Sequence, residues 1–118
     1  MAQHNETGKT GESLAIEYLE KDGYNILEKN WRYGKCEVDV IAWKGDLLHF
    51  IEVKTRKDED FGLPEEKVNK KKISNLMKAA SEYIYLRPEW KKIQLDILSI
   101  KILPGEPIEY FFIEDVYL

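Results

Sequence analysis

An amphipathic helical segment lies between two apolar strand-like segments, and this order constrains the fold more than any other feature of the sequence. Residues 47–55 and 93–102 have strand character, whereas apolar side chains in residues 65–87 recur every three or four positions. A helix between two strands carries the chain back to the end where the first strand began, so the two strands lie parallel in one sheet. The sequence therefore predicts an α/β fold.

Four further segments complete the predicted architecture. Residues 9–22 form a helical pattern in which Gly8, Gly11, Ala15, Tyr18 and Leu19 share one face, so the two glycines would allow close approach to the sheet. Strands are expected at 24–33, 36–43 and 108–113. The predicted order is αβββαββ, a single domain over residues 1–118 with a central mixed sheet flanked by helices.

Composition and charge indicate the cellular compartment of the domain and the kinds of partner it could have. The chain has one cysteine, so no internal disulfide can form, and no apolar run approaches the ~20 residues of a membrane span. The N-terminal residues lack the pattern of a signal peptide. We therefore expect a cytoplasmic protein without a membrane partner. The net charge is −4, but residues 64–92 carry a net charge of +4, which leaves a polyanionic partner open.

A tight turn fixes the register of the central hairpin. Gly45 and Asp46 separate two alternating strands, and pairing Lys44 with Leu47 makes the numbers of facing residues sum to 91. Asp39 would then face Glu52 on the same side of the sheet. A second facing pair on that side would be Glu37 and Lys54.

Two carboxylates that face each other at roughly 5 Å repel, and the conflict has three resolutions. One acid holds a proton, a cation neutralises both, or both splay into solvent. Mg²⁺ favours such oxygen pairs. With Lys54 beside Glu52, and Glu12 turned inward from the first helix, the set would suit metal-assisted phosphodiester hydrolysis. The structural alternative is a solvated strand face with an ordinary Glu37–Lys54 ion pair.

Basic residues flank these acids and could contact phosphates. Lys72 lies at the edge of the apolar stripe of the second helix, where its ammonium can reach the rim of a cleft, whereas Lys71 and Lys78 oppose that stripe. The candidate nucleic-acid-binding residues are Arg32, Arg56, Lys70, Lys71 and Lys72. His49 shares a face with Val40 and Ile51, so we expect core or edge packing rather than metal binding.

The chain resembles the bacterial YraN family in a series of short motifs with matching order and spacing. These motifs are Gly11-Glu12, Gly23-Tyr24, Asn30-Trp31-Arg32, Glu37-Val38-Asp39-Val40-Ile41-Ala42 and Ile51-Glu52-Val53-Lys54-Thr55-Arg56, continued by Phe61-Gly62, Lys72 and Leu95-Asp96. That family is similar to the restriction-endonuclease-like, PD-(D/E)XK superfamily and to its Holliday junction resolvases. One departure is Cys36, which stands where the family usually has glycine.

The resemblance implies a nuclease that depends on Mg²⁺ or Mn²⁺. By position, Asp39, Glu52 and the backbone carbonyl of Val53 would bind metal, Lys54 would be the catalytic lysine, and Glu12 the acid of the first helix. DNA, including branched or single-stranded DNA, would be the substrate.

Two other functions remain open at the level of sequence. The basic segment also suits a nucleic-acid-binding module without turnover, and the overall acidity suits a module that binds only proteins. The oligomeric state is open too. The aromatic final strand either closes the core or pairs with a second copy in a homodimer.

Overall fold

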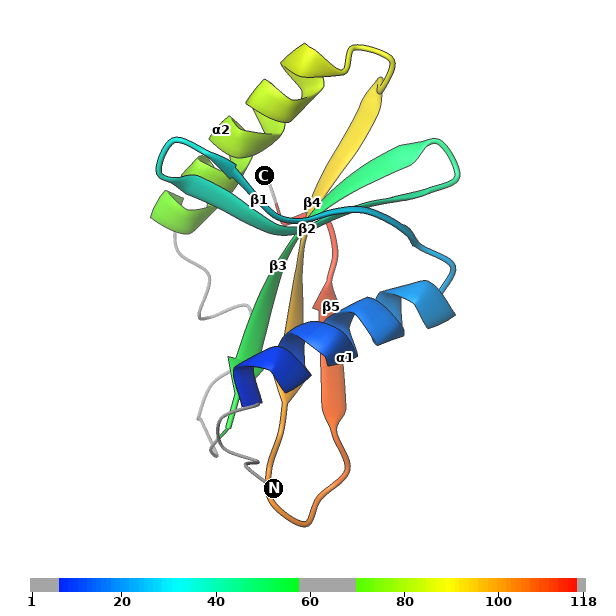
Figure 1. Ribbon diagram of the computed structural model, residues 1–118, viewed down its shortest axis with the longest axis vertical. Coiled ribbons are helices and arrows are strands. Elements are labelled where there is room, and N and C mark those ends of the chain that lie inside the picture. Colours follow the sequence, from blue (N-terminus) through cyan, green and yellow to red (C-terminus); the bar gives the residue numbers. More distant parts are fainter. Residues whose placement is uncertain (1–6, 58–69, 117–118) are drawn as a thin grey trace.

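The computed structural model describes residues 7–57 and 70–116, which form two helices and one five-stranded sheet (Figure 1). The elements are α1 (Thr7–Lys21), β1 (Asn25–Tyr33), β2 (Cys36–Lys44), β3 (Leu47–Arg56), α2 (Lys70–Leu86), β4 (Lys92–Lys101) and β5 (Glu109–Ile113). The predicted order αβββαββ is confirmed. The expected start of the second helix, residues 65–69, and the loop motif Phe61-Gly62 lie outside the described residues.

The strands follow one another across the sheet in chain order, β1-β2-β3-β4-β5. The pair β3–β4 is parallel, and the other three neighbouring pairs are antiparallel. The mixed sheet with one parallel pair, expected from the helix between residues 47–55 and 93–102, is therefore confirmed.

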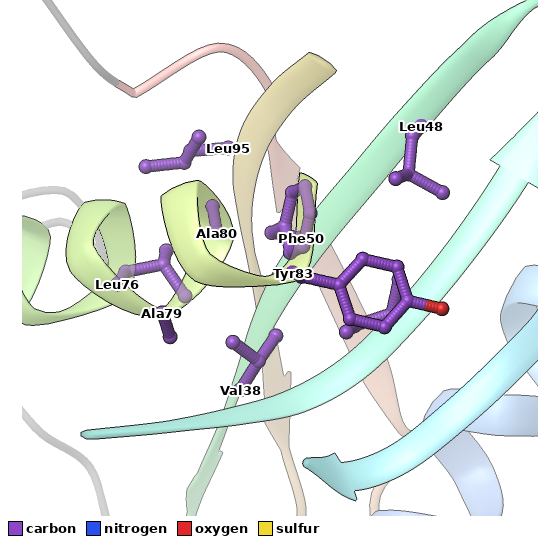
Figure 2. Close-up of a cluster of buried hydrophobic side chains, with 9 residues drawn as sticks. Val38, Leu48, Phe50, Leu76, Ala79, Ala80, Tyr83 and Leu95 are labelled. Atoms are coloured by element: carbon purple, nitrogen blue, oxygen red, sulfur yellow. The ribbon is translucent and has the colours of Figure 1, made fainter. Parts of the chain in front are cut away.

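Helix α2 packs on one face of the sheet through the apolar stripe seen in its sequence. Leu76, Ala80 and Tyr83 are buried among side chains of β2, β3 and β4 (Figure 2). The ring of Tyr83 meets Phe50 and Trp31 edge-on, with ring centroids 5.7 and 5.1 Å apart. This packing holds α2 mainly over β2, and side chains of β3 and β4 complete the contact.

Helix α1 packs on the opposite face of the sheet. Ala15 and Leu19 are fully buried there, and Tyr18 stacks on Tyr110 of β5 with ring centroids 4.6 Å apart. A Cβ atom at Gly11 would lie 2.4 Å from Thr55 Oγ1, so only glycine allows this approach of α1 to β3. The close contact predicted from the helical pattern is confirmed at Gly11.

Regular alternation is interrupted in the β1–β2 hairpin. Strand β1 has a register shift between Ile26 and Glu28, and Asn30 has a positive φ of 55°. In β2, Val38 and Ile41 both belong to the core beneath α2 although they are three residues apart. The irregular stretch therefore includes Asp39, one of the acids that the sequence analysis singled out.

Neither of the two described helices is long and apolar enough to cross a lipid bilayer.

Candidate active site

The register predicted for the central hairpin is correct over its whole paired length. Lys44 pairs with Leu47, and the ladder continues to Val40 opposite Ile51. It ends there, one step before Asp39 and Glu52. The prediction that these two acids are direct cross-strand partners is therefore wrong, because β2 and β3 stop pairing at that point.

The side chain of Asp39 replaces the missing backbone contact between the strands. Its Oδ2 atom accepts a hydrogen bond from the backbone N–H of Val53 over 2.8 Å. A carboxylate that binds a neighbouring main chain in this way lies between the strands, at the point where they separate. Val53 thus belongs to the site through its backbone, while its side chain packs on the α1 side.

Burial raises the pKa of Asp39 to about 6, and the negative charges of Glu52 and Glu37 act in the same direction. The hydrogen bond from Val53 and the charge of Lys72 oppose this shift of the pKa. The repulsion inferred from sequence is therefore present even though Asp39 and Glu52 are not ladder partners. This carboxylate is poised to gain a proton or a cation.

Glu52 has a cationic partner from the other side of the cleft between sheet and helix. Lys72 Nζ of α2 lies 2.5 Å from Glu52 Oε2 of β3. The hydrogen bond to Glu52 raises the pKa of Lys72, although burial opposes it. The ammonium of Lys72 thus reaches the rim of the site, as its place on the helical stripe predicted.

Lys54 extends from the same face of β3 as Glu52. Burial lowers the pKa of Lys54, and the neighbouring charge of Lys72 lowers it further. An open pocket adjoins these amino groups, lined by Glu52, Lys54, Lys72, Ile73, Leu76, Ile97 and Val116. Among the described residues, Glu37 forms an ion pair with its β1 partner Arg32 over 3.8 Å, and not with Lys54 as the structural alternative supposed.

Glu12 of α1 is half-buried, as its position on the helix suggested. Its Oε2 atom accepts a hydrogen bond from the side chain of Asn30 over 2.8 Å. Within residues 7–57 and 70–116, no three His, Cys, Asp or Glu side chains come close enough to hold a metal ion together. The role predicted for Glu12 at a metal stays a prediction.

The candidate phosphate-binding residues come from three elements, β1, β3 and α2. Lys70 and Lys71 are exposed in the first turn of α2, beside Lys72. Arg56 follows Lys54 by two residues in β3 and is half-buried. Arg32 lies in β1, where it contacts Glu37 over 3.8 Å.

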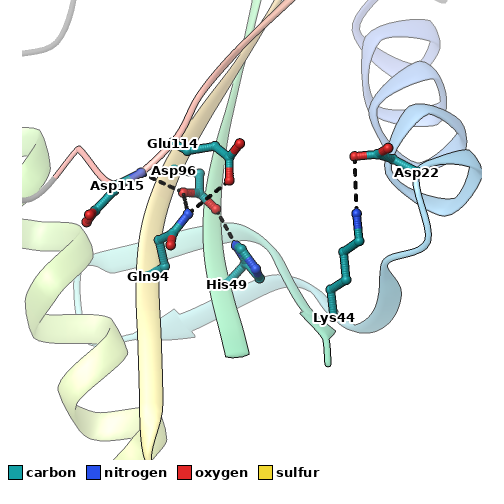
Figure 3. Close-up of polar contacts among 7 residues, drawn as sticks. All are labelled: Asp22, Lys44, His49, Gln94, Asp96, Glu114 and Asp115. Carbon is teal, nitrogen blue, oxygen red and sulfur yellow. Dashed lines mark hydrogen bonds and ion pairs between the residues drawn. The ribbon is translucent and has the colours of Figure 1, made fainter. Parts of the chain in front are cut away.

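One buried polar pair was not predicted from the sequence. His49 is packed in the core, as expected, but its Nδ1 atom also lies 2.6 Å from Asp96 Oδ2 (Figure 3). Asp96 is fully buried in β4. The signal in the sequence was an aspartate within an apolar strand, because a buried carboxylate needs partners. Its partner could not be identified without the β3–β4 register.

Comparison with known proteins places the chain among bacterial relatives. The profile of uncharacterised protein family UPF0102 matches residues 11–100. A UPF0102 protein of Christiangramia forsetii is 45% identical over 118 residues, which cover 99% of this chain and 98% of that protein. One from Flavobacterium psychrophilum is 46% identical over 100 residues, 85% of this chain and 84% of its own length. A third, from Dictyoglomus thermophilum, is 51% identical over 96 residues, 80% and 81% of the two chains.

The match to the family profile spans most of the stretch that carries the resemblance described from the motifs, including Asp39, Glu52, Lys54 and Lys72. The relatives cover most of this chain at more than 40% identity. The chain therefore belongs to family UPF0102.

Proposed function

We propose that this protein is a metal-dependent nuclease that hydrolyses phosphodiester bonds of DNA. The observation that carries the proposal is the meeting of two acids and two lysines where β2 and β3 stop pairing. Asp39, Glu52 and Lys54 come from the two strands, and Lys72 comes from α2. The two carboxylates repel each other and could share a divalent cation. The two ammonium groups beside them could bind a phosphate of the substrate.

The donor set fits Mg²⁺ or Mn²⁺. Mg²⁺ commonly uses one or two carboxylates and completes its shell with water and substrate phosphate oxygens. Asp39 and Glu52 would supply the carboxylates, and the backbone carbonyl of Val53 is a further candidate ligand. A bound divalent ion would lower the pKa of a coordinated water and neutralise charge that develops on the phosphate.

Lys54 and Lys72 have different roles from the acids in this proposal. Lys54 Nζ would bind a non-bridging phosphate oxygen and hold the phosphate beside the two acids. Lys72 would orient Glu52 through their 2.5 Å contact and add positive charge on the helix side. Val53 would hold the Asp39 carboxylate in place through its N–H. Resemblance to Holliday junction resolvases makes branched and single-stranded DNA the first substrates to try.

The test is cleavage of plasmid, single-stranded and four-way-junction DNA with Mg²⁺ or Mn²⁺, and with EDTA as the blank. We expect metal-dependent cleavage that falls at least about 100-fold in Asp39→Ala. Asp46→Ala is the matched control, because Asp46 is an exposed acid in the β2–β3 turn. Equal cleavage by wild type and Asp39→Ala, or cleavage in EDTA, would refute the proposal.

A second candidate function is a nucleic-acid-binding module without turnover. The observation that favours it is a run of three lysines in α2, Lys70, Lys71 and Lys72, of which Lys70 and Lys71 are exposed beside the candidate site. Clustered lysines can neutralise several phosphates. This function predicts salt-sensitive DNA binding that survives Asp39→Ala and weakens when the three lysines are replaced. Metal-dependent cleavage by the wild type would exclude it.

A further inference from the structure

Asn30 in β1 lies opposite Asp39 in β2, at a position where the two strands are not regular ladder partners. The residues on either side of this position do pair, Lys29 with Val40 and Trp31 with Val38. Asp39 therefore lies between two neighbours. Asn30 of β1 is on one side, and on the other is Val53 of β3, whose N–H binds the Asp39 carboxylate.

The turn of α1 that carries Glu12 contacts both strands that flank β2. Glu12 Oε2 accepts a hydrogen bond from the side-chain amide of Asn30 in β1 over 2.8 Å. The preceding residue, Gly11, lies directly against Thr55 of β3. Since β2 lies between β1 and β3 in the sheet, this turn spans the place where β2 and β3 separate, beside Asp39.

Asparagine meets two requirements at position 30. The φ of Asn30 is 55°, and its side chain is exposed, so packing in the core does not force this conformation. Asparagine adopts a positive φ more readily than most residues, and its amide can donate to a carboxylate. Glycine would satisfy only the first requirement, and glutamine or serine only the second. Unusual backbone conformations of this kind cluster at functional sites.

We propose that Asn30 is a positioning residue, which holds the Glu12 carboxylate at the edge of the site formed by Asp39 and Glu52. The inference rests on the proposed nuclease function. Because no three acids within the described ranges come close enough to hold one ion together, Glu12 would act through water and not as a third ligand. Mg²⁺ and similar ions keep several waters in protein sites. With Oε2 held by Asn30, Oε1 of Glu12 can accept a hydrogen bond from such a water.

The test is titration of the metal-free protein with Mn²⁺, followed by calorimetry without nucleic acid. Asn30→Gly adopts the positive φ but lacks the amide, so it should fold normally and bind Mn²⁺ about tenfold more weakly. Glu12→Ala should show a similar loss. Because Asn30 acts through Glu12, the double variant should bind no more weakly than Glu12→Ala alone.

Asp115→Gly is the matched control. Asp115 is the other non-glycine residue with a positive φ among the described residues, at 57°, and it lies after β5. Glycine at this position should leave the affinity for Mn²⁺ unchanged. Thermal unfolding without metal verifies that each variant is folded.

The outcomes separate this inference from the proposed function. Unchanged affinity for Mn²⁺ in Asn30→Gly, or losses that add up in the double variant, would overturn the role of Asn30 alone, because Asn30 would then not act through Glu12. Absence of Mn²⁺ binding by the wild type would also overturn it. Absence of metal-dependent DNA cleavage in addition would overturn the proposed function as well.

Discussion

The carboxylate of Asp39 in β2 accepts the backbone N–H of Val53 in β3 over 2.8 Å, immediately beyond the last paired residues of the two strands. A side-chain hydrogen bond thus links the two strands at the point where their main-chain pairing ends. The separation of the strands leaves the acid partly buried and close to the charge of Glu52. The ionised carboxylate of Asp39 is therefore unfavourable for the folded state, and its effect on the free energy of unfolding can be measured.

Asp39→Asn should stabilise the metal-free protein at neutral pH. The pKa of Asp39 is about 6 in the folded state and 3.8 in the unfolded reference, so folding favours the protonated acid. Ionisation therefore lowers the free energy of unfolding, fully above about pH 6 and not at all below about pH 4. We expect Asp39→Asn to add about 1–2 kcal/mol at pH 7.5, after allowance for partial exposure, and nothing near pH 4.

Urea denaturation in EDTA at the two pH values measures this effect. Asp46→Asn is the control, since the hydrogen bond from Lys92 lowers the pKa of Asp46 and its removal should bring no gain. A less stable Asp39→Asn protein at neutral pH would contradict the expectation.

Divalent metal should raise the stability of the wild type and not that of Asp39→Asn. An ion that binds only the folded state stabilises it by mass action, by about 2.7 kcal/mol at a hundredfold excess over its dissociation constant. Thermal unfolding with increasing Mg²⁺ or Mn²⁺ is the measurement. Asp46→Asn should respond like the wild type. An equal rise of Tm in the Asp39→Asn protein would show that the ion binds elsewhere.

Asp96→Ala should be among the most destabilising single substitutions. It removes the partner of the buried His49 and leaves the Asp115 N–H without its acceptor. Loss of one member of a buried polar pair costs about 3–5 kcal/mol. Chemical denaturation compares it with Asp22→Ala, whose exposed ion pair with Lys44 should contribute less than about 1 kcal/mol. Similar losses in the two variants would contradict this account of the core.

Gly11→Ala should destabilise the contact between α1 and β3, although alanine favours helices. Its Cβ would lie 2.4 Å from Thr55 Oγ1, so the helix or the strand must shift, at a cost of about 1–3 kcal/mol. Thr55→Ala removes the clashing atom and should recover most of the loss in the double variant. Ser13→Ala, on the exposed side of α1, serves as the control. A double variant as unstable as Gly11→Ala would indicate another cause.

Much of the fold could be predicted because its signals are local. The Gly45-Asp46 turn determined the register from Lys44–Leu47 to Val40–Ile51, and the apolar stripe of α2 indicated which side of that helix packs on the sheet. The small residue at Gly11 indicated where helix and strand approach. Each inference needs only the period of a helix or strand, or the geometry of a tight turn.

The sequence alone determined the order of elements, the parallel β3–β4 pair and the choice of Asp39, Glu52, Lys54 and Lys72 as chemically unusual residues. Only the tertiary structure decided that β2 and β3 separate at Asp39, that Lys72 pairs with Glu52, and that Asp96 meets His49 and the backbone of Asp115. These contacts join residues from 14 to 47 positions apart in the chain. Local periodicity cannot specify them, because each depends on how strands end, bend and pack against elements from elsewhere in the sequence.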